Sequence, residues 1–367
     1  MRVLQIINSL HMGGAEKILF DLSLGLRDIG VDVDVYLLED VDNIYKTELL
    51  KSGISVTALG KKGGNVYNPI IYIIKLIRNL HKYDIVHVHL FPAQYWAAFA
   101  YFLSLQKPVL ITTEHSTHNK RREIKYFKKI EKFIYSQYAK IICVADISKE
   151  ILTKYLKDEK NRCISIPNGV NISKYIDAQP LFRERIGLQE SDKILLMVAG
   201  FREMKQQETV IEALRYLPPD FKAVFVGDGE RRSYCERYAI ELKVNDRVLF
   251  LGTRTDVPNL LHTADIIIMS SHYEGLSLSS IEGMCAGKPF IASDVPGLKE
   301  VVFNAGILFP EKDTQCLASI CEHLINDRDY YNLIANRCLE RAQNYDITEM
   351  IKKYYSVYKE LYENRKV

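Results

Sequence analysis

Short apolar runs alternate with helix-like segments along the whole chain, and this alternation restricts the fold more than any other feature of the sequence. Seven runs in the first half have the length and composition of buried strands: RVLQII, VDVDVYLL, SVTAL, DIVHVHL, VLITTE, KIICVA and CISIP. The segments between them repeat apolar residues with a helical period, as AEKILFDLSLGLRDIG does. Strands that alternate with helices build βαβ units, and such units form a doubly wound parallel sheet.

The same pattern starts again after a turn-rich stretch around residues 168–180, with the strand-like runs ILLMVAG, KAVFVG, RVLFLG, DIIIMSS and PFIASD. A chain of 367 residues also has the length of two domains. We therefore predict an α/β protein whose two Rossmann-like domains, 1–172 and 190–345, are joined by a linker over 173–189 and face a central cleft. A final helix over 346–367, with an aromatic stripe, is predicted to cross back to the first domain.

Composition and charge argue against several classes of protein. The net charge of only +3 speaks against a general nucleic-acid binder. The seven cysteines form no C-x-x-C pair and most lie in apolar segments, so we expect free thiols in a reducing compartment. The N-terminal segment MRVLQIINSL does not match a signal peptide, and the longest apolar run, YWAAFAYFLSL, has about half the length of a membrane span. We therefore expect a cytoplasmic protein that can still lie on a membrane.

Polar residues and glycines follow several predicted strands, where open α/β sheets bind ligands. Gly13 and Gly14 open the first helix, and a glycine pair there lets a phosphate approach the backbone; an ordinary strand-to-helix turn explains them equally well. The pair is not part of a G-x-G-x-x-G, so a dinucleotide fingerprint is absent. His115 and His118 follow the strand VLITTE, where they can bond a ligand or form a surface pair.

Two patterns suggest metal ligation, and both have a simpler interpretation. His87 and His89 share one face of a strand, but no Cys or Asp joins them at ligand spacing. Two Asp-Val-Asp triplets, at 32–34 and 40–42, are interpreted as an exposed strand face and a loop. We predict no metal site and no cofactor.

The segment 119–140 is strongly basic. It holds eight Lys or Arg and two Glu, a net charge of +6, so the rest of the chain sums to −3. Its apolar residues recur at helical spacing, and Lys125, Lys128, Lys129 and Lys132 lie off that stripe. A basic amphipathic helix indicates an anionic membrane surface. A solvated helix face is the alternative, and the charge asymmetry favours the membrane slightly.

Two further segments carry charges at strand ends in the second half. Arg202 and Lys205 follow ILLMVAG, where cations suit a diphosphate, although two surface charges are the alternative. The segment SSHYEGLSLSSIEGMCAGKP holds Glu274 and Glu282, which are separated by seven residues. Ser279 and Glu282 match the S-x-x-E capping box, which explains Glu282 structurally. Glu274 has no such explanation, and we interpret it as functional.

Taken in order, these motifs resemble the retaining family-four glycosyltransferases of the GT-B fold, and the resemblance covers nearly the whole chain. Its strongest element is EGLSLSSIEGMCAGKPFIASDVPGLKEVV, which is similar to the family's Glu–seven residues–Glu signature. Supporting elements are GGAEK, IPNGVN, FVGDGERR and VLFLGTRTDVPNLLHTAD. The resemblance implies that the second domain binds a nucleotide-activated sugar and that the first binds the acceptor.

The resemblance also implies a role for each candidate residue. Glu274 would face the donor sugar, and Glu282 would bind the ribose hydroxyls. Lys205 and Arg202 would neutralise the departing diphosphate, and His115 would lie near the sugar. The remaining implied contacts are Gly14, Gly275, Leu276, Ser277, Leu278, Thr253 and Arg254 for the donor, and Glu16 and His118 for the acceptor.

We therefore expect a metal-independent, retaining glycosyltransferase that uses a UDP- or GDP-sugar. The basic segment favours a lipid-linked or polysaccharide acceptor in bacterial surface-glycan synthesis, on the inner face of the cell membrane. The alternatives are a GT-B nucleotide-sugar epimerase, which needs no acceptor, and a non-catalytic protein that binds sugar nucleotides. The sequence does not indicate the base, the sugar or the oligomeric state.

Overall fold

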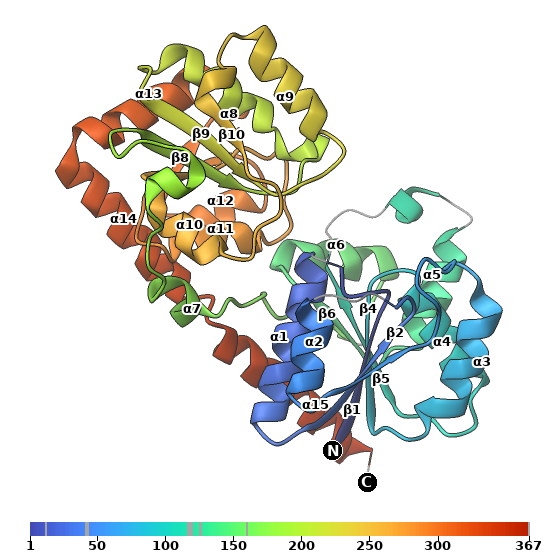
Figure 1. Cartoon of the computed structure of the whole chain (residues 1–367). Coiled ribbons are helices and arrows are strands. Elements are labelled where there is room, and N and C mark those ends of the chain that lie inside the picture. Colours follow the sequence, from blue (N-terminus) through green and yellow to red (C-terminus); the bar gives the residue numbers. More distant parts are fainter. Residues whose placement is uncertain (12, 41–43, 116–119, 125–126, 159–160, 366–367) are drawn as a thin grey trace. The chain divides into compact units, whose positions relative to one another are not determined.

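The computed structural model describes residues 1–11, 13–40, 44–115, 120–124, 127–158 and 161–365. The chain forms two compact units. The first contains Met1–Gly169 and Ile347–Val367, and the second contains Val170–Asp346. Each unit is built around one parallel sheet with helices on both faces (Figure 1). The prediction of two doubly wound α/β domains is confirmed.

The first unit has a seven-stranded sheet in the order β3-β2-β1-β4-β5-β6-β7. Its strands are β1 (Arg2–Ile7), β2 (Asp32–Leu37), β3 (Ser55–Ala58), β4 (Ile85–His89), β5 (Val109–Glu114), β6 (Lys140–Cys143) and β7 (Cys163–Ser165). Its helices are α1 (Gly14–Asp28), α2 (Ile44–Lys51), α3 (Pro69–Leu80), α4 (Ala93–Leu103), the 3-10 turn η1 (Lys120–Glu123), α5 (Phe127–Ser136), α6 (Asp146–Leu156) and α15 (Ile347–Asn364). The strand order reverses between β1 and β4, which pair directly.

The second unit has a six-stranded sheet in the order β10-β9-β8-β11-β12-β13. Its strands are β8 (Lys193–Val198), β9 (Phe221–Val226), β10 (Val248–Phe250), β11 (Ile266–Met269), β12 (Phe290–Ser293) and β13 (Ile307–Phe309). Its α-helices are α7 (Ile172–Ile176), α8 (Gln207–Ala213), α9 (Arg232–Glu241), α10 (Val257–Thr263), α11 (Leu278–Met284), α12 (Leu298–Val302), α13 (Thr314–Asn326) and α14 (Arg328–Gln343). Its 3-10 turns are η2 (Arg183–Ile186), η3 (Glu203–Lys205), η4 (Leu214–Tyr216) and η5 (Asn245–Arg247). Here the order reverses between β8 and β11.

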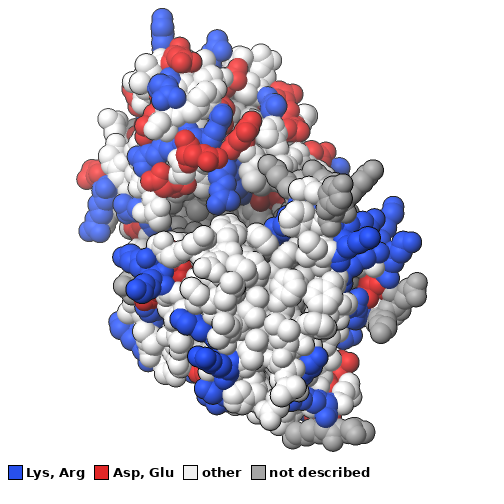
Figure 2. Space-filling view, turned by 90° about the vertical axis from the view of Figure 1, so that its right-hand side faces the viewer, with Lys and Arg blue, Asp and Glu red and all other residues white. Residues whose placement is uncertain are grey.

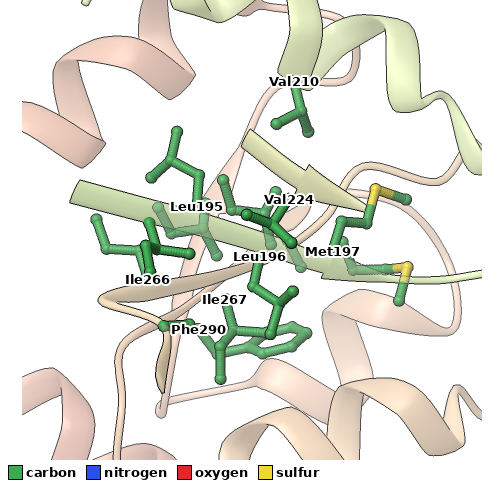
Figure 3. Packing of buried hydrophobic residues seen from close by; sticks show 14 of the residues in the cluster. Leu195, Leu196, Met197, Val210, Val224, Ile266, Ile267 and Phe290 are labelled. Carbon is green, nitrogen blue, oxygen red and sulfur yellow. The ribbon is translucent and has the colours of Figure 1, made fainter. Parts of the chain in front are cut away.

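The central strands of the second unit are buried on both faces, which explains why they appear in the sequence as continuous apolar runs. Leu195, Leu196 and Met197 of β8 are each about 1% exposed. Figure 3 shows the packing around them, with Val210 of α8 on one side of the strands and the ring of Phe290 on the other.

The structure differs from the sequence prediction in two places. The segment 173–189 is not an isolated linker: it carries α7 and η2 and is anchored in the second unit, where the guanidinium of Arg183 binds Asp265 at 3.0 Å. In addition, β13 was not expected, because its three residues are too few to show a period.

The final helix, α15, belongs to the first unit and packs along α1 (Figure 1). Tyr354 and Tyr358 of its aromatic stripe are completely buried, and their hydroxyls bond residues of the sheet. All seven cysteines are free thiols, and six of them are buried. Within the described residues, the structure has no helix that is both long enough and apolar enough to cross a membrane.

Candidate functional site

The loops that follow β8 and β11 are bonded to each other at the point where the strand order of the second sheet reverses. The Ser270 hydroxyl lies 2.8 Å from the carbonyl oxygen of Gln206 and 3.1 Å from that of Lys205. The backbone N–H of His272 donates to the carbonyl of Met204 at 2.8 Å. Such reversal points are where open α/β sheets bind ligands, at the carboxyl ends of the strands. Hydrogen bonds therefore hold the two loops together at the carboxyl ends of β8 and β11, where a ligand site is expected.

Lys205 and Glu274 form an ion pair on this surface, through Nζ and Oε1. The hydroxyl of Ser271 donates to the same carboxylate oxygen at 2.7 Å. The two charged side chains are only 17% and 9% exposed, so the pair is largely shielded from water. The structure thus joins two residues that are 69 positions apart in the chain, both of which the sequence singled out. Ser271 was not predicted, because a serine after a strand carries no signal of its own.

Gly297 holds the backbone of Glu274 in place. The N–H of Glu274 donates to the carbonyl of Pro296 at 3.2 Å. Gly297 has a φ of +88°, and a Cβ on it would lie 2.2 Å from the carbonyl oxygen of Glu274. Only glycine fits a position that combines this conformation with this contact. Gly297 was not predicted as a site residue, although a glycine after proline in DVPGLKE is a recognisable turn signal.

The helix that follows Glu274 begins earlier than the capping-box prediction requires. The N-cap of α11 is Ser277, whose hydroxyl accepts the N–H of Ser280. Glu282 is therefore the fifth residue of the helix, and Ser279 lies inside the helix, so the capping box is wrong. Glu282 is 7% exposed. Helix capping therefore does not explain why Glu282 is present.

The other predicted donor residues lie on loops of the same unit. Gly275 and Leu276, both partly buried, connect Glu274 to Ser277, and Leu278 is the first residue of α11. Arg202 is exposed and precedes η3. Arg254, which follows β10, makes two hydrogen bonds to its neighbour Asp256, at 2.8 and 2.7 Å, and Thr253 beside it is exposed.

In the first unit, His115 directly follows β5 and lies over a buried network of polar side chains. Its Nε2 is 2.9 Å from Nδ1 of His89, and the other ring nitrogen of His89 is 3.0 Å from Oε1 of Gln5. The ring nitrogens of His87 lie 2.5 Å from the Tyr358 hydroxyl and 2.7 Å from the Thr113 hydroxyl. The ring nitrogens of His87 and His89 are therefore used in hydrogen bonds. Among the residues that the structure describes, no group of three or more His, Cys, Asp or Glu could hold a metal ion.

Burial keeps these three histidines uncharged. It lowers the pKa of His115 to about 4 and, with a contribution from His115, the pKa of His87 to about 3. Burial and the two neighbouring rings lower the pKa of His89 well below its usual value. Around neutral pH each ring therefore carries one N–H and one acceptor nitrogen.

The remaining predicted residues of the first unit lie at the start of α1. Gly14 is its first residue, after the extended Gly13, and both are exposed. The carboxylate of Glu16 lies over Gly13, because a Cβ on that glycine would lie 2.4 Å from Oε2 of Glu16. His118 and Lys125 lie outside the described residues.

Comparison with known families identifies the two halves of the chain separately. Residues 12–174 match the model described as Glycosyltransferase Family 4, and residues 178–344 match the model described as Glycosyl transferases group 1. The chain belongs to the family-four glycosyltransferases of the GT-B fold. Together the two matches extend over both units of the structure.

Individual relatives agree with this family. The chain is 28% identical over 362 residues to the UDP-Gal:alpha-D-GlcNAc-diphosphoundecaprenol alpha-1,3-galactosyltransferase of Escherichia coli, covering 94% of this chain and 90% of the relative. It is 24% identical to the N,N'-diacetylbacillosaminyl-diphospho-undecaprenol alpha-1,3-N-acetylgalactosaminyltransferase of Campylobacter jejuni, over 61% of each chain. Among solved structures, Anabaena Alr3699/HepE in complex with UDP and glucose has a TM-score of 0.84 at 23% identity, covering 97% of this chain and 99% of that one. The chain is therefore a glycosyltransferase.

Proposed function

We propose that this glycosyltransferase moves a hexose from a UDP-sugar to a sugar carried on a polyprenyl diphosphate, and that it forms an alpha linkage with retention of configuration. The observation that carries the proposal is the shielded Lys205–Glu274 pair, which lies at the strand-order reversal of the second sheet. Two relatives are named for alpha-1,3 transfer to diphosphoundecaprenol-linked sugars, and solved neighbours contain UDP or UDP-glucose. These names support the donor and acceptor classes.

The chemistry of transfer explains why a lysine and a carboxylate lie together. The nucleoside diphosphate leaves with additional negative charge, and an ammonium group beside it stabilises that charge most strongly as the bond breaks. Lys205 supplies this cation, with Arg202 as a second one, and we propose that no metal ion is required. Glu274 supports the positive charge that develops on the sugar. Because Ser271 holds the carboxylate and Gly297 fits against the backbone of Glu274, little reorganisation is needed during the reaction.

We propose that the other candidate residues bind the ends of the donor and the acceptor. Glu282, no longer explained as a helix cap, accepts the ribose hydroxyls. The neutral His115 contributes a hydrogen bond near the sugar, and Glu16 contacts the acceptor. The remaining donor contacts are assigned to the backbone of Gly14, Gly275, Leu276, Ser277 and Leu278 and to the turn at Thr253 and Arg254.

The test is transfer itself. The purified protein is incubated with UDP-galactose, UDP-glucose or UDP-N-acetylglucosamine, with and without a polyprenyl-diphosphate-linked sugar. We expect UDP release only when acceptor is present, together with an alpha-linked product identified by NMR. An epimerase would change the sugar nucleotide without acceptor. A protein that only binds the nucleotide would release no UDP in either case, and both results contradict the proposal.

A further inference from the structure

We propose that one face of the first unit, formed by α3, the end of α4 and α5, docks on an anionic membrane surface. This inference rests on the proposed lipid-linked acceptor, and it identifies the surface of the first unit that contacts the membrane. It goes beyond the basic segment seen in the sequence, because the apolar part of the face comes from α3 and α4. We call it the α3–α5 face.

The α3–α5 face exposes large apolar side chains that a water-facing surface does not need. Ile70 of α3 is 66% exposed, and Ile71 and Ile74 on the same helix are also exposed. Phe102 and Leu103 at the end of α4 are more than half exposed. The helices that carry these side chains are neighbours, because α3 packs along α4 and the ring of Phe102 lies 5.2 Å from that of Phe133 in α5. Large apolar side chains exposed together on neighbouring helices mark an interaction site.

The exposed charged side chains on these helices are all positive. Glu131 is the only carboxylate residue in α3, α4 and α5, and it is completely buried, where it accepts the Tyr95 hydroxyl at 2.6 Å. Lys128 and Lys129 are exposed, and Lys132 is partly exposed. Figure 2 views the molecule from the side on which α3, α4 and α5 lie in Figure 1. It shows a broad area without charged residues, flanked by groups of Lys and Arg.

This combination fits a membrane better than a second copy of the chain. A symmetric dimer through the α3–α5 face would bring like charges together, whereas a bilayer with acidic lipids offers a negative surface over an apolar interior. The twelve residues of α3 span roughly 18 Å, which is shorter than the apolar core of a bilayer. The helix therefore lies in the interface, with its isoleucines towards the acyl chains and the α5 lysines near the headgroups.

Vesicle sedimentation without any nucleotide sugar tests the apolar part. The vesicles contain phosphatidylglycerol and phosphatidylethanolamine in a ratio of about one to three, and pure phosphatidylcholine is the comparison. The variant carries Ile70→Ser, Ile71→Ser and Ile74→Ser, and the matched control carries Ile240→Ser and Phe303→Ser, which are exposed apolar positions of the second unit. We expect the α3 variant to bind at least about tenfold more weakly than wild type and the control to bind normally.

The charged part is tested by Lys128→Ser, Lys129→Ser and Lys132→Ser together. Each lysine near an acidic membrane contributes about a fivefold increase in binding, so the triple variant should bind about a hundredfold more weakly at low salt and differ less at high salt. The proposal is overturned if wild type does not bind the acidic vesicles, or if the α3 variant binds as well as wild type. It is also overturned if wild type is a dimer that the α3 substitutions convert to a monomer. UDP binding, titrated separately, is expected to be unchanged, so failure here does not bear on the transferase proposal.

A second inference comes from the hydrogen bonds beneath His115. We infer that Gln5 and Tyr358 are positioning residues that fix which nitrogen of His115 carries the hydrogen. Tyr358 belongs to α15, near the end of the chain, and its hydroxyl lies within hydrogen-bond distance of Gln5 in β1 and His87 in β4.

The direction of the bonds follows from what each atom can do. Nε2 of Gln5 can only donate, so the hydroxyl of Tyr358, 3.2 Å away, accepts from it. Oε1 of Gln5 can only accept, so the hydrogen of His89 is on Nε2. Nδ1 of His89 is then an acceptor, and Nε2 of His115 must donate to it. His115 is thus held with hydrogen on Nε2 and with Nδ1 as its acceptor nitrogen.

Nitrogen NMR of protein labelled with ¹⁵N-histidine tests this chain without any substrate. The His115 signals are assigned by their loss in His115→Gln. We expect wild type to show a protonated Nε2 and an unprotonated Nδ1. Tyr358→Phe and Gln5→Leu, each of which breaks the chain, should give a mixture of the two tautomers, whereas Tyr355→Phe on the same helix should not.

Under the proposed function, the same two variants should lower kcat by about twofold or more, because half or more of the rings present the wrong nitrogen, with little change in the KM for the donor. A protonated Nδ1 in wild type, which would mean the opposite orientation of the Gln5 amide, overturns the inference. So does an unchanged His115 tautomer in both variants. Because the NMR result needs no substrate, it stands or falls independently of the transfer reaction.

Discussion

Replacing Glu274 by glutamine should make the nucleoside diphosphate bind more tightly while transfer slows. In the structure, Lys205 is paired with Glu274, and we propose that the diphosphate also needs this lysine. The two anionic groups would then compete for one cation. Glutamine keeps the size of the side chain and its hydrogen bond to Ser271 but removes the negative charge. Lys205 is therefore released to the diphosphate.

The size of the effect follows from the kind of hydrogen bond that is replaced. Hydrogen bonds to charged groups contribute about 1.5–3 kcal/mol, against about 0.5–1.5 kcal/mol for neutral ones. The change from carboxylate to amide therefore weakens the competing bond by about 1 kcal/mol, which corresponds to about fivefold tighter binding of UDP. The effect should be visible because both side chains are at least four-fifths buried. It should decrease at high salt only modestly, since buried pairs are screened less than exposed ones.

Titration calorimetry with UDP and the transfer assay separate the two consequences. Glu274→Gln should bind UDP about fivefold more tightly, Glu274→Ala should retain UDP binding, and both should lose transfer. The matched control is Glu212→Gln in α8, which removes a carboxylate of the same unit that contacts Tyr238 and Arg215. Equal or weaker UDP binding by Glu274→Gln would refute the competition for Lys205. Near wild-type transfer by Glu274→Ala would refute the role of Glu274.

Further consequences can be measured on single variants. Gly297→Ala introduces a Cβ at positive φ, 2.2 Å from the carbonyl oxygen of Glu274, so transfer should fall at least tenfold; normal activity would contradict the role of this turn. Ser277→Ala removes the N-cap of α11 and should destabilise the second unit by about 1 kcal/mol, measured by urea unfolding. Glu282→Gln should mainly weaken UDP binding. If both variants lose the same stability, Glu282 has a capping role after all. The first unit, followed by the fluorescence of Trp96, the only tryptophan, should lose stability as the pH falls from 6.5 to 5. His87, His89 and His115 have lowered pKa values in the folded unit, so between pH 6.5 and 5 they bind protons only in the unfolded state. Each should lower the free energy of unfolding by about 1–2 kcal/mol over this range. A stability that does not change with pH would mean that these histidines are already charged in the folded unit.

The strands were predictable because each unit buries its sheet on both faces. Continuous apolar runs such as ILLMVAG follow from that burial and can be recognised one segment at a time. The three residues of β13 carried too little signal, and only pairing with β12 makes them a strand. Lys205 and Glu274 could be singled out because each follows a strand whose carboxyl end is a likely ligand position in any open α/β sheet.

The local motif at Glu282 shows where prediction from sequence fails. S-x-x-E is a good description of a capping box, but the helix starts at Leu278, and Ser277 caps it. The choice between two serines two residues apart depends on the preceding loop, and Gly297, which is distant in sequence, fits against the backbone of that loop. A motif that uses neighbouring residues alone does not contain this information.

The α/β class, the two sheets, the family and the strand-end positions of Lys205 and Glu274 can be recognised from the sequence, because all of these follow from local periodicity and from residues at strand ends. Which atoms meet depends on how the chain packs. The tertiary structure paired Lys205 with Glu274 and connected Tyr358 of the last helix to His115 through Gln5 and the buried His89. Such contacts join residues tens to hundreds of positions apart, and they exist only when the packed sheet brings its strand ends and helices together.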